Sequence, residues 1–115
     1  MFDRVAASLG NYMDLLSVRQ KLVASNIANA ATPGYKTKDI DFQFELQSQM
    51  GRETTAPAQV SEVQGLGTHN DGNNVSLDRE ARLLSENALR FNVASQLWRN
   101  KLRMLRNAVQ DGRNG

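Results

Sequence analysis

The sequence predicts an all-α fold: two long amphipathic helices at the chain ends pack as an antiparallel, coiled-coil-like pair, joined by a short helix and a flexible, largely irregular middle. Two observations lead to this prediction. Apolar residues recur at alternating steps of four and three at both ends, and the stretch 51–74 between them has no such period. The length of 115 residues suits one structural unit. We divide it into 1–35 (N-terminal helix and turn), 36–74 (short helix and linker) and 75–115 (C-terminal helix, one unit with 1–35).

The N-terminal helix is expected from about Phe2 to about Ala30. Its apolar line has one polar member, Gln20, and otherwise consists of Phe2, Ala6, Leu9, Met13, Leu16, Val23, Ile27 and Ala30. Four further apolar residues widen this face: Val5, Tyr12, Leu15 and Leu22. The face is therefore broad enough to contact more than one neighbour. We expect the most buried packing residues to be Leu9, Met13, Leu16, Val23 and Ile27.

Residues 39–50 fit two patterns. Apolar residues alternate as in a strand, at Ile40, Phe42, Phe44 and Leu46, while Phe42, Leu46 and Met50 fit one face of a helix. We prefer a short helix after Asp41. The stretch 51–74 is rich in Gly, Ser, Thr, Asn and Gln, and we expect a connection that is mobile in the free monomer and able to order on assembly.

The C-terminal helix is expected to begin after an N-cap at Ser76 and to stop at Gly112. Acidic residues in its first turn and basic residues near its end suit the helix dipole. Its apolar line consists of Leu77, Ala81, Leu84, Ala88, Phe91, Ser95, Trp98, Leu102, Leu105 and Val109. The members expected to bury most area are Leu84, Phe91, Trp98, Leu102 and Leu105.

The length of these helices has a structural consequence. A helix of about 30 residues is roughly 45 Å long, so the molecule should be elongated. Apolar stripes of this length need either each other or the stripes of neighbouring subunits to be covered, and we expect both. The dilute monomer should accordingly have low helicity.

Catalytic and metal chemistry finds little support in the sequence. The absence of Cys excludes disulfides, thiolate zinc sites, iron–sulfur clusters and thiol nucleophiles. His69, the only histidine, lies in a turn-rich segment without a second ligand.

Asp71, Asn73 and Asn74 suggest a calcium loop, but Ser76 stands at its glycine position and Arg82 at its bidentate-acid position, so this interpretation fails. No phosphate-binding loop, secretory signal or membrane-length apolar run is present. We therefore predict no catalytic residue, cofactor, metal site or small-molecule substrate.

The charges are distributed unevenly along the chain. Residues 75–115 hold eight Lys and Arg against four Asp and Glu, a net +4, whereas residues 1–74 carry −2. A basic helix raises the alternative of a small nucleic-acid-binding protein. Nucleic-acid binding requires aromatic stacking platforms or a denser basic face than this segment offers, so a solvated helix face is the preferred interpretation. The opposite signs of the two segments favour pairing within or between subunits.

The stretch 24–35 contains a predicted turn. Pro33 and Gly34 suit the central positions of a type II turn, and Thr32 is pushed out of the helical region because it precedes proline. The helix must therefore end near Ala31.

Asn26 and Asn29 flank Ile27 and Ala28 in the last turns of this helix, where asparagine has poor helix propensity. Their amides can satisfy terminal carbonyls of the helix or bind a neighbouring subunit. Both interpretations stay open at this point.

Residues 24–35 resemble the N-terminal signature shared by the rod, hook and related axial proteins of the bacterial flagellum. Segments 36–42, 71–80 and 87–91 resemble the proximal rod branch of that family. Hook and distal rod relatives carry large inserted domains, for which 115 residues leave no room. The chain departs from the family pattern at Ala31, where Asp is frequent, and at Phe91, where Tyr is frequent.

The resemblance implies a structural subunit of the proximal rod in the flagellar basal body, needed for motility. Such proteins are made in the cytoplasm, exported unfolded by the flagellar type III apparatus, and polymerise in the periplasm by helix–helix packing. The implied partners are other proximal rod proteins, further copies of the chain, and the membrane-ring and export-gate base of the flagellum. The signature residues implied at a subunit contact are Asn26, Ile27, Asn29, Thr32, Pro33, Gly34 and Tyr35.

Overall fold

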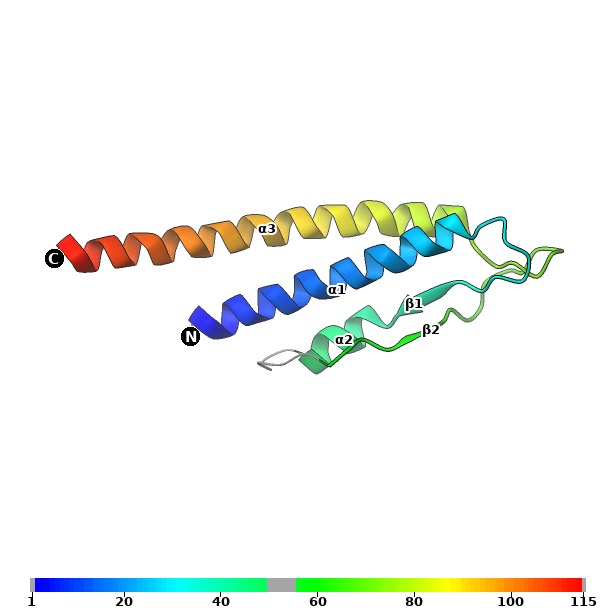
Figure 1. Cartoon of the computed structure of the whole chain (residues 1–115), viewed down its shortest axis with the longest axis horizontal. Coiled ribbons are helices and arrows are strands. Elements are labelled where there is room, and N and C mark those ends of the chain that lie inside the picture. Colours follow the sequence, from blue (N-terminus) through cyan, green and yellow to red (C-terminus); the bar gives the residue numbers. More distant parts are fainter. Residues whose placement is uncertain (1, 50–55, 115) are drawn as a thin grey trace.

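The computed structural model describes residues 2–49 and 56–114, and most of them are helical. In chain order the elements are α1 (Phe2–Ala28), β1 (Lys38–Ile40), α2 (Phe42–Gln49), β2 (Val60–Glu62) and α3 (Leu77–Asn114). The molecule measures 71 × 23 × 16 Å, which confirms the predicted elongated shape (Figure 1).

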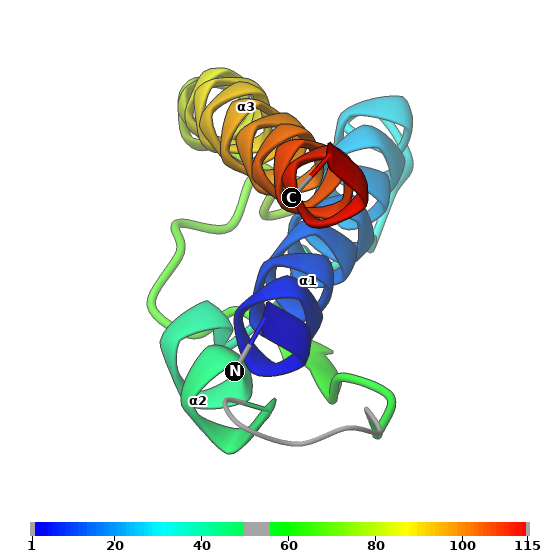
Figure 2. The ribbon, with the colours of Figure 1, turned by 90° about the vertical axis from the view of Figure 1, so that its left-hand side faces the viewer.

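The helix α1 occupies the middle of the molecule. Along one side it contacts α3, which runs in the opposite direction, and along another it contacts α2 and β1 (Figures 1 and 2). Leu15 and Leu16 of α1 are buried with Ile40 and Phe42 in one apolar cluster. The broad apolar face predicted for this helix is confirmed, because it serves two neighbours within the same chain.

The line of α3 that is buried differs from the expected one. The buried positions Glu80, Leu83, Asn87 and Ala94 each lie one residue before a member of the expected line. Asn87 Nδ2 donates a hydrogen bond of 3.2 Å to Gln20 Oε1 on α1. The α1–α3 contact is therefore partly polar, and α3 is rotated relative to the expectation.

The expected packing residues of α3 are consequently only partly covered by this contact, and Leu102 and Leu105 belong to the part of α3 that extends past α1. Leu84, Phe91, Leu102 and Leu105 are 39%, 40%, 45% and 47% exposed, and Trp98 is half-buried. This line contributes less to the contact with α1 than expected, although Phe91 lines the groove between the two helices. Its residues remain open to contacts with other chains.

The middle of the chain forms the preferred short helix, and of the strand-like alternation from Ile40 to Leu46 only Ile40 belongs to a strand. Asp41 caps α2 by accepting a 3.1 Å hydrogen bond from Phe44 N, which confirms the short helix after Asp41. Before it, β1 pairs antiparallel with β2, with Lys38 opposite Glu62 and Ile40 opposite Val60. Sequence analysis missed β2 inside the expected linker. Residues 50–55, which include Met50 and the start of that linker, lie outside the described residues.

The ends of the two long helices were predicted with mixed success. α1 ends at Ala28, close to the expected end. Ser76 Oγ accepts a 3.3 Å hydrogen bond from Arg79 N at the start of α3, which confirms the predicted N-cap. The predicted stop at Gly112 is wrong, since α3 continues to Asn114. A glycine inside a helix costs only about 1 kcal/mol, and Gly112 does not adopt the positive φ of a helix cap.

Candidate functional site

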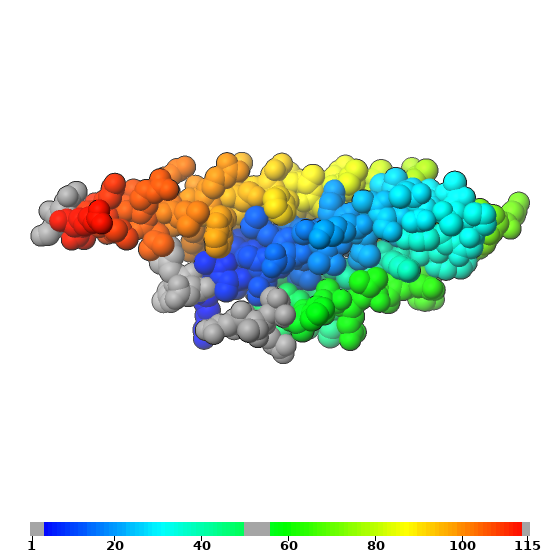
Figure 3. Space-filling view, in the orientation of Figure 1, coloured from blue at the N-terminus to red at the C-terminus, as the bar shows by residue number. Residues whose placement is uncertain are grey.

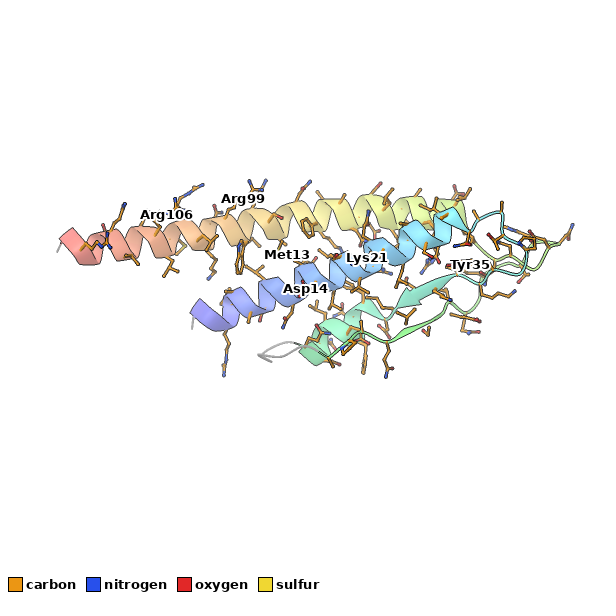
Figure 4. The ribbon with its side chains drawn as sticks, viewed as in Figure 1. Met13, Asp14, Lys21, Tyr35, Arg99 and Arg106 are labelled. Carbon is orange, nitrogen blue, oxygen red and sulfur yellow. The ribbon has the colours of Figure 1, made fainter. Side chains whose placement is uncertain are left out.

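The signature segment forms the predicted type II turn. Tyr35 N donates a 3.2 Å hydrogen bond to Thr32 O, and Gly34 has a φ of 76°. Pro33 precedes Gly34 at the position where its fixed φ suits this turn. The turn lies at the end of the molecule opposite both chain termini, where Tyr35 is seen beside the loops (Figure 4).

Asn26 connects α1 to the strand that follows the turn. Its Nδ2 donates to Lys38 O at 2.8 Å, and its Oδ1 accepts from Tyr35 Oη at 2.9 Å and from Lys38 N at 3.1 Å. The residue is 1% exposed. The Asn26 side chain is thus occupied inside the subunit, and the expectation that it binds a neighbouring subunit does not hold in this fold.

The amide of Asn29 binds within its own subunit, as the first of the two interpretations expects. Its Nδ2 donates to Ser25 O at 2.8 Å, and its Oδ1 accepts from Thr32 Oγ1 at 3.1 Å. The amide therefore satisfies a carbonyl in the last turn of α1 and supports the turn that follows.

A second segment, residues 71–74, completes this site. Asn73 is fully buried, and its Nδ2 donates to Asn29 O and Thr32 O, both at 2.8 Å. Asn74 Oδ1 accepts from Thr37 N at 2.6 Å. Sequence analysis tested these asparagines only as calcium ligands. Their position just before a helix, in a run of turn-forming residues, is the signal that could have assigned them a structural role.

Two glycines allow the segments to approach each other. Gly34 N donates to Asp71 O at 2.9 Å, and Gly72 has a φ of 86°. A Cβ on Gly72 would lie 3.4 Å from Gly34 Cα. We call residues 26–37 together with 71–74 the turn cluster, since they form one hydrogen-bonded unit.

A charged network links three elements next to the turn cluster. Asp39 on β1 accepts from Arg19 Nη2 at 3.0 Å and from Arg79 Nη2 at 2.5 Å. Arg79 Nη1 also binds Glu80 Oε1 at 2.7 Å, and the Glu80 side chain is fully buried. Within the described residues, Glu80 Oε2 has no hydrogen-bond partner. Because Arg79 lies on α3, its bond to Asp39 holds the start of α3 against β1, where Glu80 and Leu83 are buried.

The exposed surface of α3 is the second feature of functional interest. We define line A as its large apolar residues from the expected stripe that are exposed: Leu77, Leu84, Phe91, Leu102, Leu105 and Val109. Near its middle, a groove of about 360 Å³ runs between α1 and α3 and includes Leu16, Ser17 and Phe91 in its lining. Every residue from 102 to 113 is exposed, because α3 extends past the N-terminus of α1 (Figures 1 and 3).

The remaining predicted contact residues vary in exposure. Leu16 and Val23 are buried, whereas Leu9 and Met13 are half-buried. In the signature, Tyr35 is half-buried, and the exposed members are Ile27, Thr32, Pro33 and Gly34. These four are free to contact another chain.

The described residues offer no arrangement typical of an active site. They contain no group of three or more metal-ligating side chains, and His69 is exposed. None of the described helices has the length and apolar character needed to cross a bilayer. The structure therefore defines a class of protein: an elongated helical subunit with a rigid polar turn at one end and uncovered apolar surface along its longest helix.

Comparison with known proteins identifies the family. Residues 13–36 match the model of the family described as flagella basal body rod protein. The chain is 33% identical to the flagellar basal body rod protein FlgB of Salmonella typhimurium, with 97% of this chain and 99% of that protein covered. The FlgB proteins of Escherichia coli K12 and Bacillus subtilis 168 are 32% and 24% identical, over 97% and 98% of this chain and 99% and 98% of their own lengths.

The chain therefore belongs to the FlgB family of flagellar basal body rod proteins. It is a structural component of the bacterial flagellar basal body and not an enzyme. This confirms the resemblance seen in residues 24–35.

Proposed function

We propose that the chain is a subunit of the proximal rod that is exported by the flagellar type III apparatus, polymerises by helix–helix packing, and is needed for motility. Its partners in this proposal are other proximal rod proteins, further copies of itself, and the membrane-ring and export-gate base of the flagellum. The observation that carries the proposal is line A, a row of large apolar side chains that the single subunit leaves 39–56% exposed.

Packing within the subunit supports the proposed mode of assembly. α1 and α3 lie side by side in opposite directions, and we propose that they act as an antiparallel coiled-coil-like pair (Figure 1). The partly polar contact at Gln20 and Asn87 leaves line A only partly covered, and its members after residue 101 lie on the part of α3 that extends past α1. Line A is thereby left for neighbouring chains.

The small apolar core supports export in an unfolded state. Among the described residues the buried apolar side chains are Leu15, Leu16, Val23, Ile40, Phe42, Val75, Leu83 and Ala94. Since the stability of a domain rises with the apolar area it buries, a core of this size opposes unfolding only weakly.

The exposed end of α3 supports folding on docking. Residues 102–113 contact no other element closely enough to be buried, and an isolated helix of this length is marginal in water. We propose that this end becomes stably helical only against a neighbour, which confines polymerisation to the growing rod. The measurement is far-UV circular dichroism with sedimentation across a concentration series. A helix content that stays constant through association would contradict folding on docking.

The exposed signature residues are proposed as a further subunit contact. Ile27, Thr32, Pro33 and Gly34 present a surface that the turn cluster holds in one conformation. Because the buried asparagines fix the backbone, this surface loses little conformational entropy on binding.

The decisive experiment replaces Leu102 by Asp in a strain that lacks the chromosomal copy. L102D should be exported in normal amounts and be absent from purified basal bodies, and the cells should not swim, because a buried unpaired carboxylate opposes apolar packing. Gln96→Asp is the matched control, since Gln96 is exposed on the polar face of the same helix. Normal swimming of L102D cells, or of cells without the chain, would refute the proposal.

A further inference from the structure

The exposed end of α3 carries a row of arginines on one side. We call it the arginine row, and it consists of Arg99, Arg103, Arg106 and Arg113. Steps of four, three and seven residues keep these side chains on the same side of the helix. All four are exposed, and Arg99 and Arg106 point away from α1 (Figure 4). Among the described residues, none of the four has an ion-pair partner.

The arginine row has no compensating acidic residues nearby. From residue 87 to residue 110, α3 contains no Asp or Glu. Asp111, the acid that follows, lies roughly 120° away from the row around the helix axis. Residues 102–113 are all exposed, because α3 extends past the N-terminus of α1 (Figure 1). Like charges three or four residues apart destabilise a helix, so the row points to an anionic partner outside the subunit.

The arginine row borders line A. Leu102 lies four residues before Arg106, and Val109 lies four residues before Arg113. The two rows are roughly 80° apart around the helix axis. A partner that covers both needs an apolar stripe with carboxylates along one border, which is the surface of an acidic amphipathic helix.

Nucleic acid and membranes fit this surface less well. A phosphate backbone neutralises arginines but offers no apolar surface, so bound nucleic acid would leave line A in water. Helices that lie on anionic membranes carry Trp or Phe on their apolar face, and no aromatic residue follows Trp98 in this chain.

A second copy of the chain does not offer matching carboxylates on a helix. Among the described side chains, Asp14 is the only acid of α1, and Glu45, the only acid of α2, is buried. The acids of α3 that are not buried, Asp78, Glu86 and Asp111, are at least eight residues apart. None of these helices therefore aligns two exposed carboxylates at steps of three, four or seven residues in its described side chains.

We infer that the arginine row and the adjoining part of line A bind an acidic amphipathic helix of a different protein. A guanidinium group binds a carboxylate through two parallel hydrogen bonds, so carboxylates at steps of three, four or seven residues along the partner helix match the row. This inference deepens the proposed packing against other rod proteins and rests on it.

Photocrosslinking in assembled basal bodies tests the inference. A photoreactive phenylalanine derivative replaces Gln110, an exposed residue that lies within the row between Arg106 and Arg113. Asn100 is the control position, because it is exposed and lies roughly 100° away from the row. Crosslinked segments are identified by mass spectrometry. The expected product at position 110 joins the chain to a helical segment of another protein that has Asp or Glu at steps of three, four or seven residues.

Charge variants of the row give a second test that needs no crosslinker. Arg103→Gln combined with Arg106→Gln should lower the amount of chain in basal bodies about tenfold, the effect of losing two ion pairs. The variant R103K/R106K keeps both charges and should have a smaller effect. Urea unfolding of the isolated chain should stay unchanged, because neither arginine has an ion-pair partner among the described residues. Arg82→Gln removes an exposed arginine outside the row and should incorporate normally.

Several outcomes would overturn the inference while leaving the rod function intact. These are attachment at position 110 to a second copy, to lipid or to nucleic acid, attachment to a segment without such acids, and equal yields at positions 110 and 100. Normal incorporation of the R103Q/R106Q chain would overturn it as well. Absence of the unmodified chain from basal bodies would instead refute the proposed function and, with it, this inference.

Discussion

Asp39 on β1 and Arg79 on α3 form an ion pair of 2.5 Å across forty residues of sequence. Arg19 on α1 binds the same carboxylate at 3.0 Å. The buried Asp39 carboxylate thus links β1 to both long helices, α1 and α3, through ion pairs. Because Arg79 lies in the first turns of α3, its ion pair with Asp39 ties the start of that helix to β1.

Replacing Asp39 by Asn should destabilise the subunit strongly. The variant leaves two partly buried guanidinium groups without their shared carboxylate, and breaking a buried pair in this way costs about 3 kcal/mol. Urea unfolding at neutral pH, followed by circular dichroism, measures the loss. Asp14→Asn at an exposed position is the control and should change little. Equal effects of D39N and D14N would contradict this role for Asp39.

Replacing Asn26 by Ala should loosen the turn cluster. The change removes three hydrogen bonds of a buried side chain and takes away the partner of the part-buried Lys38 backbone N and O, so we expect a loss of about 2–3 kcal/mol in the free energy of unfolding. Ser25→Ala, one residue earlier and exposed, should stay close to the unmodified chain. If N26A unfolds at the same urea concentration as S25A, the structural role assigned to Asn26 is wrong.

Replacing Gly34 by Ala should strain the type II turn. A φ of 76° is unfavourable for a residue with a Cβ, and we expect a cost of about 1–2 kcal/mol. Gly67→Ala is the matched control, because Gly67 lacks a positive φ and has open space around it. Thermal unfolding of both variants provides the comparison. A G34A protein as stable as G67A would show that the turn is not needed in this form.

Variants at Leu16 and Phe91 should distinguish effects on the stability of the subunit from effects on its assembly into basal bodies. Leu16 is 1% exposed, so Leu16→Ala should lower the free energy of unfolding of the subunit by about 3 kcal/mol. Phe91 is 40% exposed, so Phe91→Ala should have a much smaller effect on the subunit and yet reduce its incorporation into basal bodies. Urea unfolding and the content of purified basal bodies are measured for both. An F91A chain that incorporates normally would remove Phe91 from the contact.

The sequence by itself determined the features that depend on neighbours along the chain. The two long helices follow from repeated apolar spacing, the N-cap at Ser76 from its hydroxyl, and the turn from Pro33 and Gly34. The broad face of α1 correctly indicated two neighbours. The signature in residues 24–35 also determined the family, because it is long enough to be specific.

Only the tertiary structure decided the features that depend on partners far away in the sequence. The pairing of β1 with β2, the burial of Asn73 and the convergence of Arg19 and Arg79 on Asp39 have no local periodicity that predicts them. The rotation of α3 is the clearest case. Its expected stripe is regular, but the line one residue earlier is the buried one, because the hydrogen bonds from Arg79 to Asp39 and from Asn87 to Gln20 reach distant segments and are directional, whereas apolar contacts are not.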